Sequence, residues 1–405
     1  MKLGAGVHLT YCSNIHPGES WAEVRANLAH HVPPVRERVA PGVEFGIGLR
    51  LSARAAAELA DADALHEFKR FLAEQRLYVF TLNGFPYGAF HGTRVKEQVY
   101  LPDWRDPERL HYTNRLADLL AALLPEALPG EPPIEGSVST VPGAFKPALD
   151  GAHDVSVIVE HLLQHVAHLV ALRARCGHSI ALALEPEPHC MLETIDEAVA
   201  FFTRELHGPA AVRRTMQLTG LDQAGATAAL HRHLGLCLDL CHAAVEYEEP
   251  AALLRQLQAA GIRVPKMQIS AGLQLPSLNA DALAALRRFD DPVYLHQVVE
   301  RGPAGLRRFA DLPEAFATVE QQQQAAQREW RVHFHVPVFL DRLPPFASTQ
   351  AFIREMLAMQ RAQPISSHLE VETYTWDVLP EALRSGTVDE AVARELAWTL
   401  TELAS

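Results

Sequence analysis

The stretch Ile180-Ala-Leu-Ala-Leu-Glu185 and the later stretch Leu234-Gly-Leu-Cys-Leu-Asp-Leu240 share one pattern, in which large apolar residues alternate with small ones before an acidic residue. Successive side chains of a strand point to opposite faces of its sheet. The leucines therefore share one face, and Glu185 and Asp239 share the other with the small residues. Such a face fits the narrow interior of a parallel barrel, whose catalytic groups lie at the C-terminal ends of the strands.

Two further stretches follow the same alternation. In Lys266-Met-Gln-Ile-Ser270, the residues Lys266, Gln268 and Ser270 share the polar face. In His368-Leu-Glu-Val-Glu372, Glu370 and Glu372 share it, while the apolar residues face the other way. We therefore expect polar side chains from several strands to converge at one rim of the barrel.

The remainder of the chain alternates strand-like runs with stretches of helical length, which predicts βαβ units and a parallel sheet. The strand candidates are Leu3–Thr10, Val43–Leu51, Leu77–Leu82, Glu135–Thr140, Ile180–Glu185, Gly235–Leu240, Val264–Ser270, Val293–Val299, Arg331–Phe339 and His368–Tyr374. The helix candidates are Trp21–Val32, Ala53–Glu74, Pro107–Leu124, Val155–Cys176, Thr194–Leu206, Glu249–Ala260 and Ala280–Phe289.

We predict an α/β protein of the (β/α)8 TIM-barrel class, because about eight repeats fit a closed barrel. No glycine fingerprint of an open dinucleotide-binding sheet follows the first strand. Val264–Ser270 is interpreted as the seventh strand and His368–Tyr374 as the eighth, with Val293–Val299 and Arg331–Phe339 as an inserted pair between them. The alternative places Arg331–Phe339 in the barrel wall. We expect one domain over residues 1–405, with insertions near 207–233 and 290–345.

Composition restricts the function. The net charge is −13, and no run of Lys or Arg offers a surface for a nucleic acid, so we expect no nucleic-acid partner. No targeting signal is visible, and no stretch reaches the roughly 18 apolar residues of a membrane helix. The 5 cysteines are few and odd in number for a chain of 405 residues, which is typical of a reduced, cytoplasmic protein.

The converging acidic residues indicate a metal site. Glu185, Asp239 and Glu372 would repel one another at one rim unless a positive charge lay between them. Oxygen ligands together with an imidazole suit a divalent cation. His242 lies three residues after Asp239, and Arg331-Val-His-Phe-His335 places two histidines on one strand face. Either position could complete the site or contact the substrate.

Other candidates leave alternatives open. Lys266 is either an ion-pair partner inside the barrel or a contact for an anionic substrate group. The segment Asn83-Gly-Phe-Pro-Tyr-Gly-Ala-Phe-His91, which leads to Lys96 and Tyr100, is either an aromatic substrate wall or a packed loop. The residues expected to contact the substrate are His242, Lys266, His333, His296, His8 and Asn83.

The order Glu185, Asp239-x-x-His242, a polar residue of strand seven and Glu372 resembles the xylose isomerase-like barrel superfamily, which includes sugar isomerases, ketose 3-epimerases and endonuclease IV. Several phrases also resemble the EboE-type metabolite traffic proteins, over nearly the whole chain. These phrases are Tyr11-Cys-Ser-Asn-Ile-His-Pro-Gly-Glu, Asn83-Gly-Phe-Pro-Tyr-Gly, Leu184-Glu-Pro-Glu-Pro and Glu370-Val-Glu-Thr-Tyr-Thr-Trp.

The resemblance implies a divalent metal (Mn, Mg, Zn or Co) with Glu185, Asp239 and Glu372 as ligands, the two glutamates also as acid–base groups, and His242 on a substrate oxygen. The histidine expected on strand seven is replaced by Gln268. Three alternatives therefore remain for the fourth ligand. Gln268 binds the metal through its carbonyl oxygen, or a histidine of the His333–His335 strand does so, with His335 foremost. In the third alternative the site has lost its metal. The EboE-type resemblance implies metabolite export or processing beside a prenyltransferase-like membrane protein.

Three functions are compatible with these features. The first is a metal-dependent isomerase or epimerase acting on a small sugar-like or polyol-like metabolite. The second is metal-assisted hydrolysis of a small phosphorylated metabolite. The third is a non-enzymatic carrier or scaffold that kept the barrel pocket, for which the loss of the strand-seven histidine argues.

Overall fold

The structure is a computed structural model of the chain, and it describes residues 1–91, 94–126, 133–321, 328–376, 379, 384 and 386–405. Within these residues, a nine-stranded sheet contains eight parallel strands, with β1 (Lys2–Gly4) added antiparallel at its edge. Going round the sheet, the parallel strands are β2 (Val7–Tyr11), β15 (His368–Val371), β8 (Lys266–Ile269), β7 (Leu234–Asp239), β6 (Ile180–Leu184), β5 (Gly136–Thr140), β4 (Leu77–Asn83) and β3 (Phe45–Arg50).

The two ends of this series meet. A parallel bridge joins Cys12, directly after β2, to Gly48 of β3, which closes the sheet into a barrel. The predicted TIM-barrel class is therefore confirmed, with all eight barrel strands at the predicted places in the chain. The strands are buried on both faces, because the leucines of β6 and β7 face the helices and the small residues face inward.

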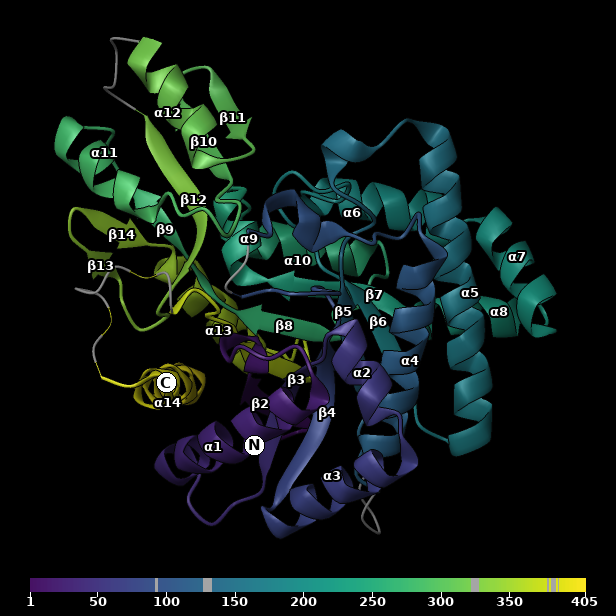
Figure 1. Cartoon of the computed structure of the whole chain (residues 1–405). Helices are drawn as coiled ribbons and strands as arrows, with labels where there is room; N and C mark the ends of the chain where they lie inside the picture. The colour runs from purple at the N-terminus through teal and green to yellow at the C-terminus, as the bar shows by residue number, and fades with distance from the viewer. Residues whose placement is uncertain (92–93, 127–132, 322–327, 377–378, 380–383, 385) are drawn as a thin grey trace.

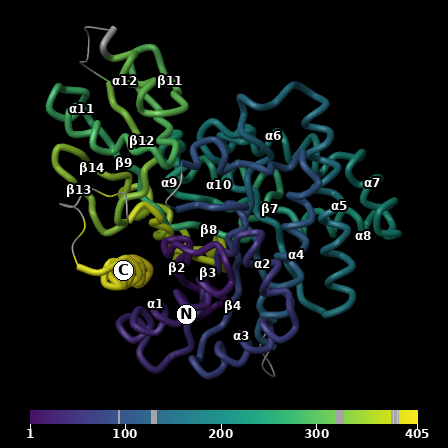
Figure 2. Tube along the Cα trace, in the orientation of Figure 1, coloured from purple at the N-terminus to yellow at the C-terminus, as the bar shows by residue number. Residues whose placement is uncertain are grey.

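Helices cover the barrel (Figures 1 and 2). They are α1 (Trp21–Val39), α2 (Ala53–Leu59), α3 (Ala62–Glu74), α4 (Pro107–Leu123), α5 (Ala152–Cys176), α6 (Ile195–Phe201), α10 (Pro250–Ala259), α13 (Gln350–Ala362) and α14 (Val388–Ala404). Several helix boundaries differ from prediction, and two differences are large. Helix α1 continues through Pro33 and Pro34, since Val32 and Val35 are buried. The predicted helix Ala53–Glu74 is two helices, because Asp61 accepts hydrogen bonds from two backbone N–H groups and caps a new one.

A second sheet is inserted between barrel strands β8 and β15. In the described part of the chain it has six strands in the order β11 (Gly305–Phe309), β10 (Val298–Gly302), β12 (Glu329–Val336), β9 (Ala271–Leu275), β14 (Phe346–Ser348) and β13 (Arg342–Leu343), all paired antiparallel. With α11 (Ala280–Leu286) and α12 (Leu312–Gln321) it forms the upper left of Figure 1. We call this unit the inserted sheet.

The inserted sheet is larger than the predicted strand pair. It begins directly after barrel strand β8, where Ser270 alone separates β8 from β9, so no turn residue marks the change. Strand β12 pairs with β9 and β10 and not with a barrel strand, so the alternative that placed it in the barrel wall is wrong. Helices α7 (Pro209–Thr219) and α8 (Gln223–His233) fill the segment 207–233 and lie outside α5, at the right of Figure 1.

Helix α5 alone among the described helices is long and apolar enough to cross a membrane. The expectation that no stretch would pass this test was wrong for α5. Core helices of globular proteins pass the same test, and α5 buries Leu162, Val166 and Leu169 within the protein. Its apolar character therefore matches its place as a packed helix of the barrel.

Candidate active site

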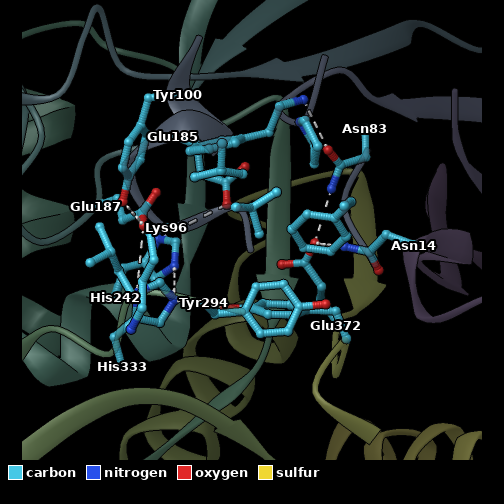
Figure 3. A pocket seen from close by; sticks show the side chains of 17 residues that line it. Asn14, Asn83, Lys96, Tyr100, Glu185, Glu187, His242, Tyr294, His333 and Glu372 are labelled. Carbon is cyan, nitrogen blue, oxygen red and sulfur yellow. Dashed lines mark hydrogen bonds and ion pairs between the residues drawn. The ribbon is translucent and has the colours of Figure 1, made fainter. Parts of the chain in front are cut away.

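A pocket lies at the C-terminal ends of the barrel strands, beneath the inserted sheet. It encloses about 530 Å³, its open mouth included. Asn14, Asn83, Glu185 and Glu372 line it from the barrel, all four labelled in Figure 3. This is the end of a TIM barrel at which active sites are found.

Three carboxylates from three strand ends form what we call the carboxylate group. Glu185 directly follows β6, Asp239 ends β7 and Glu372 directly follows β15. Asp239 also caps helix α9 (Leu240–Val245), because its Oδ1 accepts from the backbone N–H of His242 at 2.9 Å. The same oxygen accepts from the Ser270 hydroxyl at 2.7 Å. Strand parity predicted that these three carboxylates would share the barrel interior, and the structure places them there.

Glu372 is held by two amides. Its Oε1 accepts from Nδ2 of Asn14 at 2.8 Å and from Nδ2 of Asn83 at 2.9 Å. In contrast, the buried atoms Glu185 Oε2, Asp239 Oδ2 and His335 Nε2 have no hydrogen-bond partner among the described residues. Buried polar atoms without partners are unfavourable, and a cation held between neighbouring carboxylate and imidazole groups would relieve part of this cost.

The electrostatics point the same way. Burial, followed by the charges of Glu372 and Asp239, raises the pKa of Glu185 well above its usual range. Burial, followed by Asp239 and Glu370, does the same to the pKa of Glu372. Burial opposes ionisation of Asp239 too, but its neighbours His242 and His335 and its hydrogen bonds lower its pKa. The carboxylate group therefore lacks positive charge, which a divalent cation would supply.

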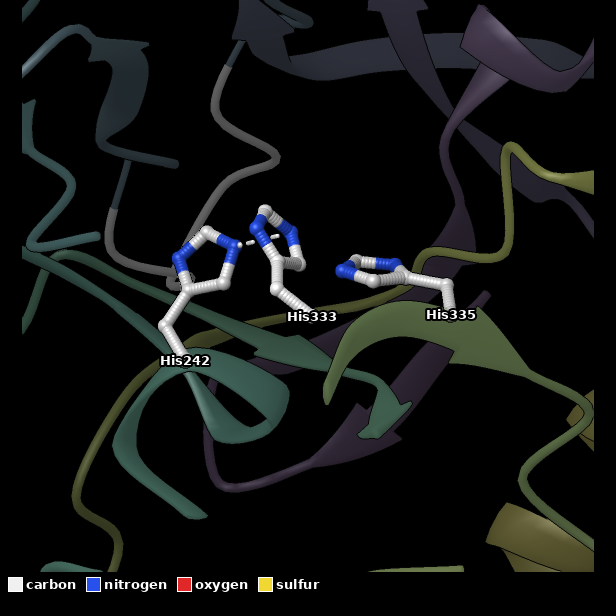
Figure 4. A group of neighbouring side chains, drawn as sticks. All are labelled: His242, His333 and His335. Atoms are coloured by element: carbon white, nitrogen blue, oxygen red, sulfur yellow. Dashed lines mark hydrogen bonds between the residues drawn. The ribbon is translucent and has the colours of Figure 1, made fainter. Parts of the chain in front are cut away.

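Three imidazoles lie beside these carboxylates, and we call them the imidazole group. His242 comes from α9, and His333 and His335 come from β12 of the inserted sheet. One ligand atom from each lies within 4.8 Å of the others. Figure 4 shows the three rings next to one another. A second set of Glu185, Asp239 and His242 meets the same distance condition. The residues present therefore fit a divalent cation through oxygen and nitrogen ligands.

A hydrogen-bond network extends from the imidazole group. Glu187 Oε1 accepts from the Tyr100 hydroxyl at 2.7 Å, and Nε2 of Gln297 donates to Tyr100 at 2.8 Å. Oε1 of Gln297 accepts from Nδ1 of His333 at 2.7 Å. Burial raises the pKa of Glu187, although His242 and the hydrogen bonds from Tyr100 and Gln297 oppose the shift. The network links the barrel end of the pocket to the inserted sheet.

The loop after β4 closes one side of the pocket. Phe85 and Phe90 line it, so aromatic rings of this loop face the pocket, and their contact with a substrate stays a prediction. The Phe90 ring lies 5.3 Å from that of Tyr294 and 5.2 Å from that of Tyr374, centre to centre. Nζ of Lys96 forms an ion pair with Asp311 of the inserted sheet at 2.6 Å, so this loop and the inserted sheet are joined over the pocket.

Four predicted site residues lie elsewhere. Oε1 of Gln268 accepts from the Cys237 thiol at 2.8 Å, so its carbonyl oxygen is already engaged inside the barrel. Lys266 pairs with Glu370 at 2.6 Å with both side chains fully buried, which is the ion-pair alternative. His8 contacts Tyr78 through Nδ1 at 2.8 Å near the start of β2, at the opposite end of the barrel from the pocket. His296 is buried in the inserted sheet, paired with Asp291.

Sequence reasoning missed several lining residues. Asn14 follows β2 in the short helix Ser13–Ile15, and nothing in the local sequence distinguishes its amide from those of other loop residues. Glu187 lies two residues beyond Glu185, in phase with the inward face, and parity extended past the strand end would have found it. Tyr374 lines the pocket from the segment that follows β15. Gln297 does not line the pocket, but it bonds Tyr100 and His333, which do.

The sequence matches no protein-family profile, and no curated protein matches it. Solved structures of xylose isomerase-like barrels are similar to it. The probable 3-DHS dehydratase AsbF from Bacillus anthracis has a TM-score of 0.46 at 12% identity, over 98% of this chain and 99% of that chain. A xylose isomerase domain protein from Alicyclobacillus acidocaldarius has a TM-score of 0.43 at 12% identity, over 98% of each chain. The IOLI protein, crystallised with a zinc atom, has a TM-score of 0.44 at 13% identity, over 98% of each chain.

Proposed function

We propose that this chain is a metal-dependent isomerase or epimerase of a small sugar-like or polyol-like metabolite. One observation carries the proposal. Two buried glutamates, Glu185 and Glu372, line one pocket (Figure 3). Ligand atoms of Asp239 and His242 lie within 4.8 Å of one of Glu185, and Glu185 Oε2 and Asp239 Oδ2 have no hydrogen-bond partner in the described part of the chain. Isomerases of this kind need a carboxylate that moves a proton at carbon and a charge that stabilises the neighbouring oxygens.

The two glutamates have different tasks in this proposal. Glu372 is fixed by the amides of Asn14 and Asn83, so it would orient the site and add negative charge toward a bound cation. Glu185 keeps Oε2 without a partner among the described residues, so this oxygen is available to take a proton from a substrate carbon and return it. A bound divalent cation would supply the polarisation of the adjacent carbonyl and hydroxyl oxygens.

The pocket lining favours a neutral, hydroxylated substrate. Aromatic rings such as Phe85 and Phe90 offer apolar surface for the faces of a sugar ring, while Glu187 and the Tyr100 hydroxyl offer polar contacts. Among the described lining residues, Lys96 is the one side chain with a permanent positive charge, and it is paired with Asp311. A phosphorylated substrate would therefore have the bound metal but no unengaged lysine or arginine among these residues to neutralise its charge, so the hydrolase alternative has less support.

The EboE-type phrases of the sequence add a cellular context to the proposal. They favour a step in the processing or export of a metabolite, beside a prenyltransferase-like membrane partner. Co-purification of the tagged chain from membranes and from the soluble fraction would test this context. Recovery from the soluble fraction alone, with no prenyltransferase-like protein attached, would contradict it.

Proton exchange at carbon tests the reaction itself. The protein is loaded with Mn²⁺, Mg²⁺, Zn²⁺ or Co²⁺ and incubated in D₂O with a panel of ketoses, aldoses and keto-sugars, and deuterium uptake beside the carbonyl is followed by NMR. We expect uptake by the wild type and a loss of about 10²–10⁴-fold in Glu185→Gln. The control is Glu395→Gln, which replaces a buried glutamate outside the pocket lining and should keep the rate.

Two outcomes would contradict the proposal. Unchanged uptake in Glu185→Gln would show that Glu185 does not move the proton. Ligand binding without uptake under every metal, and equally strong in excess chelator, would identify a carrier.

A further inference from the structure

The three histidines of the imidazole group have their tautomers fixed by their surroundings. Nδ1 of His242 lies 3.0 Å from the carbonyl oxygen of Pro186, and Nδ1 of His335 lies 2.8 Å from that of Glu372. A carbonyl oxygen only accepts, so each Nδ1 carries the proton. In a neutral ring, each Nε2 is therefore left with a free lone pair.

His333 is fixed in the same way through Gln297. Nε2 of Gln297 donates to the carbonyl oxygen of Pro188 at 3.2 Å and to Glu187 at 3.3 Å, which sets the orientation of its amide. Its Oε1 must then accept from Nδ1 of His333, at 2.7 Å. The Nε2 lone pair of His333 is thus exposed to the group as well.

Two of these lone pairs face each other, and the third belongs to a neighbouring ring of the same group. Nε2 of His242 lies 3.0 Å from Nε2 of His333, and Nε2 of His335 has no hydrogen-bond partner among the residues that the structure describes. The Tyr374 hydroxyl is 3.5 Å from Nε2 of His333, too far for a strong O–H···N bond. Two facing lone pairs at 3.0 Å repel unless a positive charge lies between them.

We propose that the imidazole group is a metal position of its own, in which Nε2 of His242, His333 and His335 bind a nitrogen-preferring divalent cation such as Zn²⁺. Histidine ligands of metals characteristically donate their other N–H to a carbonyl or carboxylate, and all three rings do so here. Three histidines leave a fourth position open on a tetrahedral cation. Oδ1 of Asp239 lies 3.9 Å from Nε2 of His242, so its negative charge is close.

The position differs from the carboxylate group in origin and in metal preference. His333 and His335 belong to the inserted sheet, whereas Glu185, Asp239 and Glu372 belong to the barrel. Imidazole nitrogens favour Zn²⁺, Co²⁺ or Ni²⁺, while carboxylates suit Mg²⁺ and Mn²⁺. The inference does not depend on the proposed isomerisation, because metal binding is measured without substrate.

X-ray absorption on the wild-type protein, loaded with one equivalent of Zn²⁺, tests the ligand set directly. We expect scattering from three imidazole rings around the ion. A shell of oxygen ligands with one imidazole or none would overturn the proposal, as would failure to bind Zn²⁺. In that last case a proton shared between His242 and His333 would explain their 3.0 Å approach.

Variants separate the two positions. Co²⁺ binding is followed by its visible absorption in wild type, His333→Gln and Glu185→Gln, with folding checked by thermal melting. We expect at least about 100-fold weaker Co²⁺ binding in His333→Gln with Mn²⁺ binding kept, and the reverse in Glu185→Gln. The control is His165→Gln, a buried histidine of α5 that bonds Asn114 and not the imidazole group, and this variant should bind Co²⁺ as the wild type does. If both variants lost the same single ion, there would be one mixed site and the proposal would fail.

Discussion

The ion pair between Lys266 and Glu370 is the strongest single test of the barrel interior. Nζ and Oε2 are 2.6 Å apart, and both side chains are 0% exposed. Burial acts to lower the pKa of Lys266, but the charge of Glu370 leaves it raised. Removing one partner strands the other charge in the barrel. We therefore expect Lys266→Met and Glu370→Leu each to lower the free energy of unfolding by about 3–5 kcal/mol.

The double variant should behave differently. With both charges gone, apolar side chains of similar volume fill the same space, and stability is expected within about 1 kcal/mol of the wild type or above it. The losses in free energy of unfolding of the two single variants would then sum to more than the loss of the double variant, by a coupling energy of at least about 3 kcal/mol. Urea denaturation at pH 7, followed by circular dichroism, measures all four proteins on one scale.

The two single variants should differ in how their free energy of unfolding depends on pH. In Lys266→Met, the unpartnered carboxylate takes up a proton on folding, so the free energy of unfolding should fall as pH rises. In Glu370→Leu, the unpartnered ammonium loses a proton on folding, so the free energy of unfolding should rise with pH. Single variants that lose less than about 1 kcal/mol, or slopes of the same sign, would refute the argument that this pair is dry and coupled.

Two further predictions concern stability. Gly48→Ala should lower the free energy of unfolding by about 1–3 kcal/mol. The added Cβ would lie 1.9 Å from Oε1 of Glu370 and 2.7 Å from the carbonyl oxygen of Tyr11. Gly88→Ala is the control, because a Cβ at Gly88 meets nothing within 4 Å. Thermal melts of the two alanine variants compare these sites, and equal midpoints would contradict the crowding at Gly48. Burial raises the pKa of Glu395 from 4.5 to about 7. The folded protein therefore binds this proton more tightly than the unfolded chain does. As pH rises from 4.5 to 7, loss of the proton should lower the free energy of unfolding by up to about 3 kcal/mol. Urea titrations should show a smaller fall in the free energy of unfolding over this pH range in Glu395→Gln than in the wild type or the exposed control Glu74→Gln. A fall of equal size in all three proteins would exclude Glu395 as its source.

The barrel could be predicted because the side-chain pattern of each strand shows which of its faces meets the helices and which faces the barrel interior. Alternation of leucines with small residues fixed which face of β6 and β7 met helices, and the same parity put Glu185 and Asp239 inside. Parity is a local property, so it survives without knowledge of the fold. The inserted sheet was harder to predict, because β9 follows β8 without a turn residue and looks in the sequence like the end of the same strand.

The candidate site was predicted only in part, because its members meet through long-range contacts. His242 and His333 lie 91 positions apart in the chain, and only the docking of β12 beside α9 brings their Nε2 atoms together. Sequence placed His333 and His335 on one strand face without showing where that face pointed. Gln268 illustrates the opposite error, since its position matched a ligand while its neighbour Cys237 already occupied its oxygen.

The inserted sheet brings two imidazoles to a rim that the barrel furnishes with carboxylates. Under the proposed metal position, changes confined to β12 would alter which ion the protein selects while the eight-stranded frame stays intact. A chain whose inserted sheet failed to dock would be expected to look folded by circular dichroism, yet it would have lost two of the three imidazoles of the proposed metal position. Structural integrity and chemical competence are thus separable in this molecule, and a protein that melts normally is not on that account an active one.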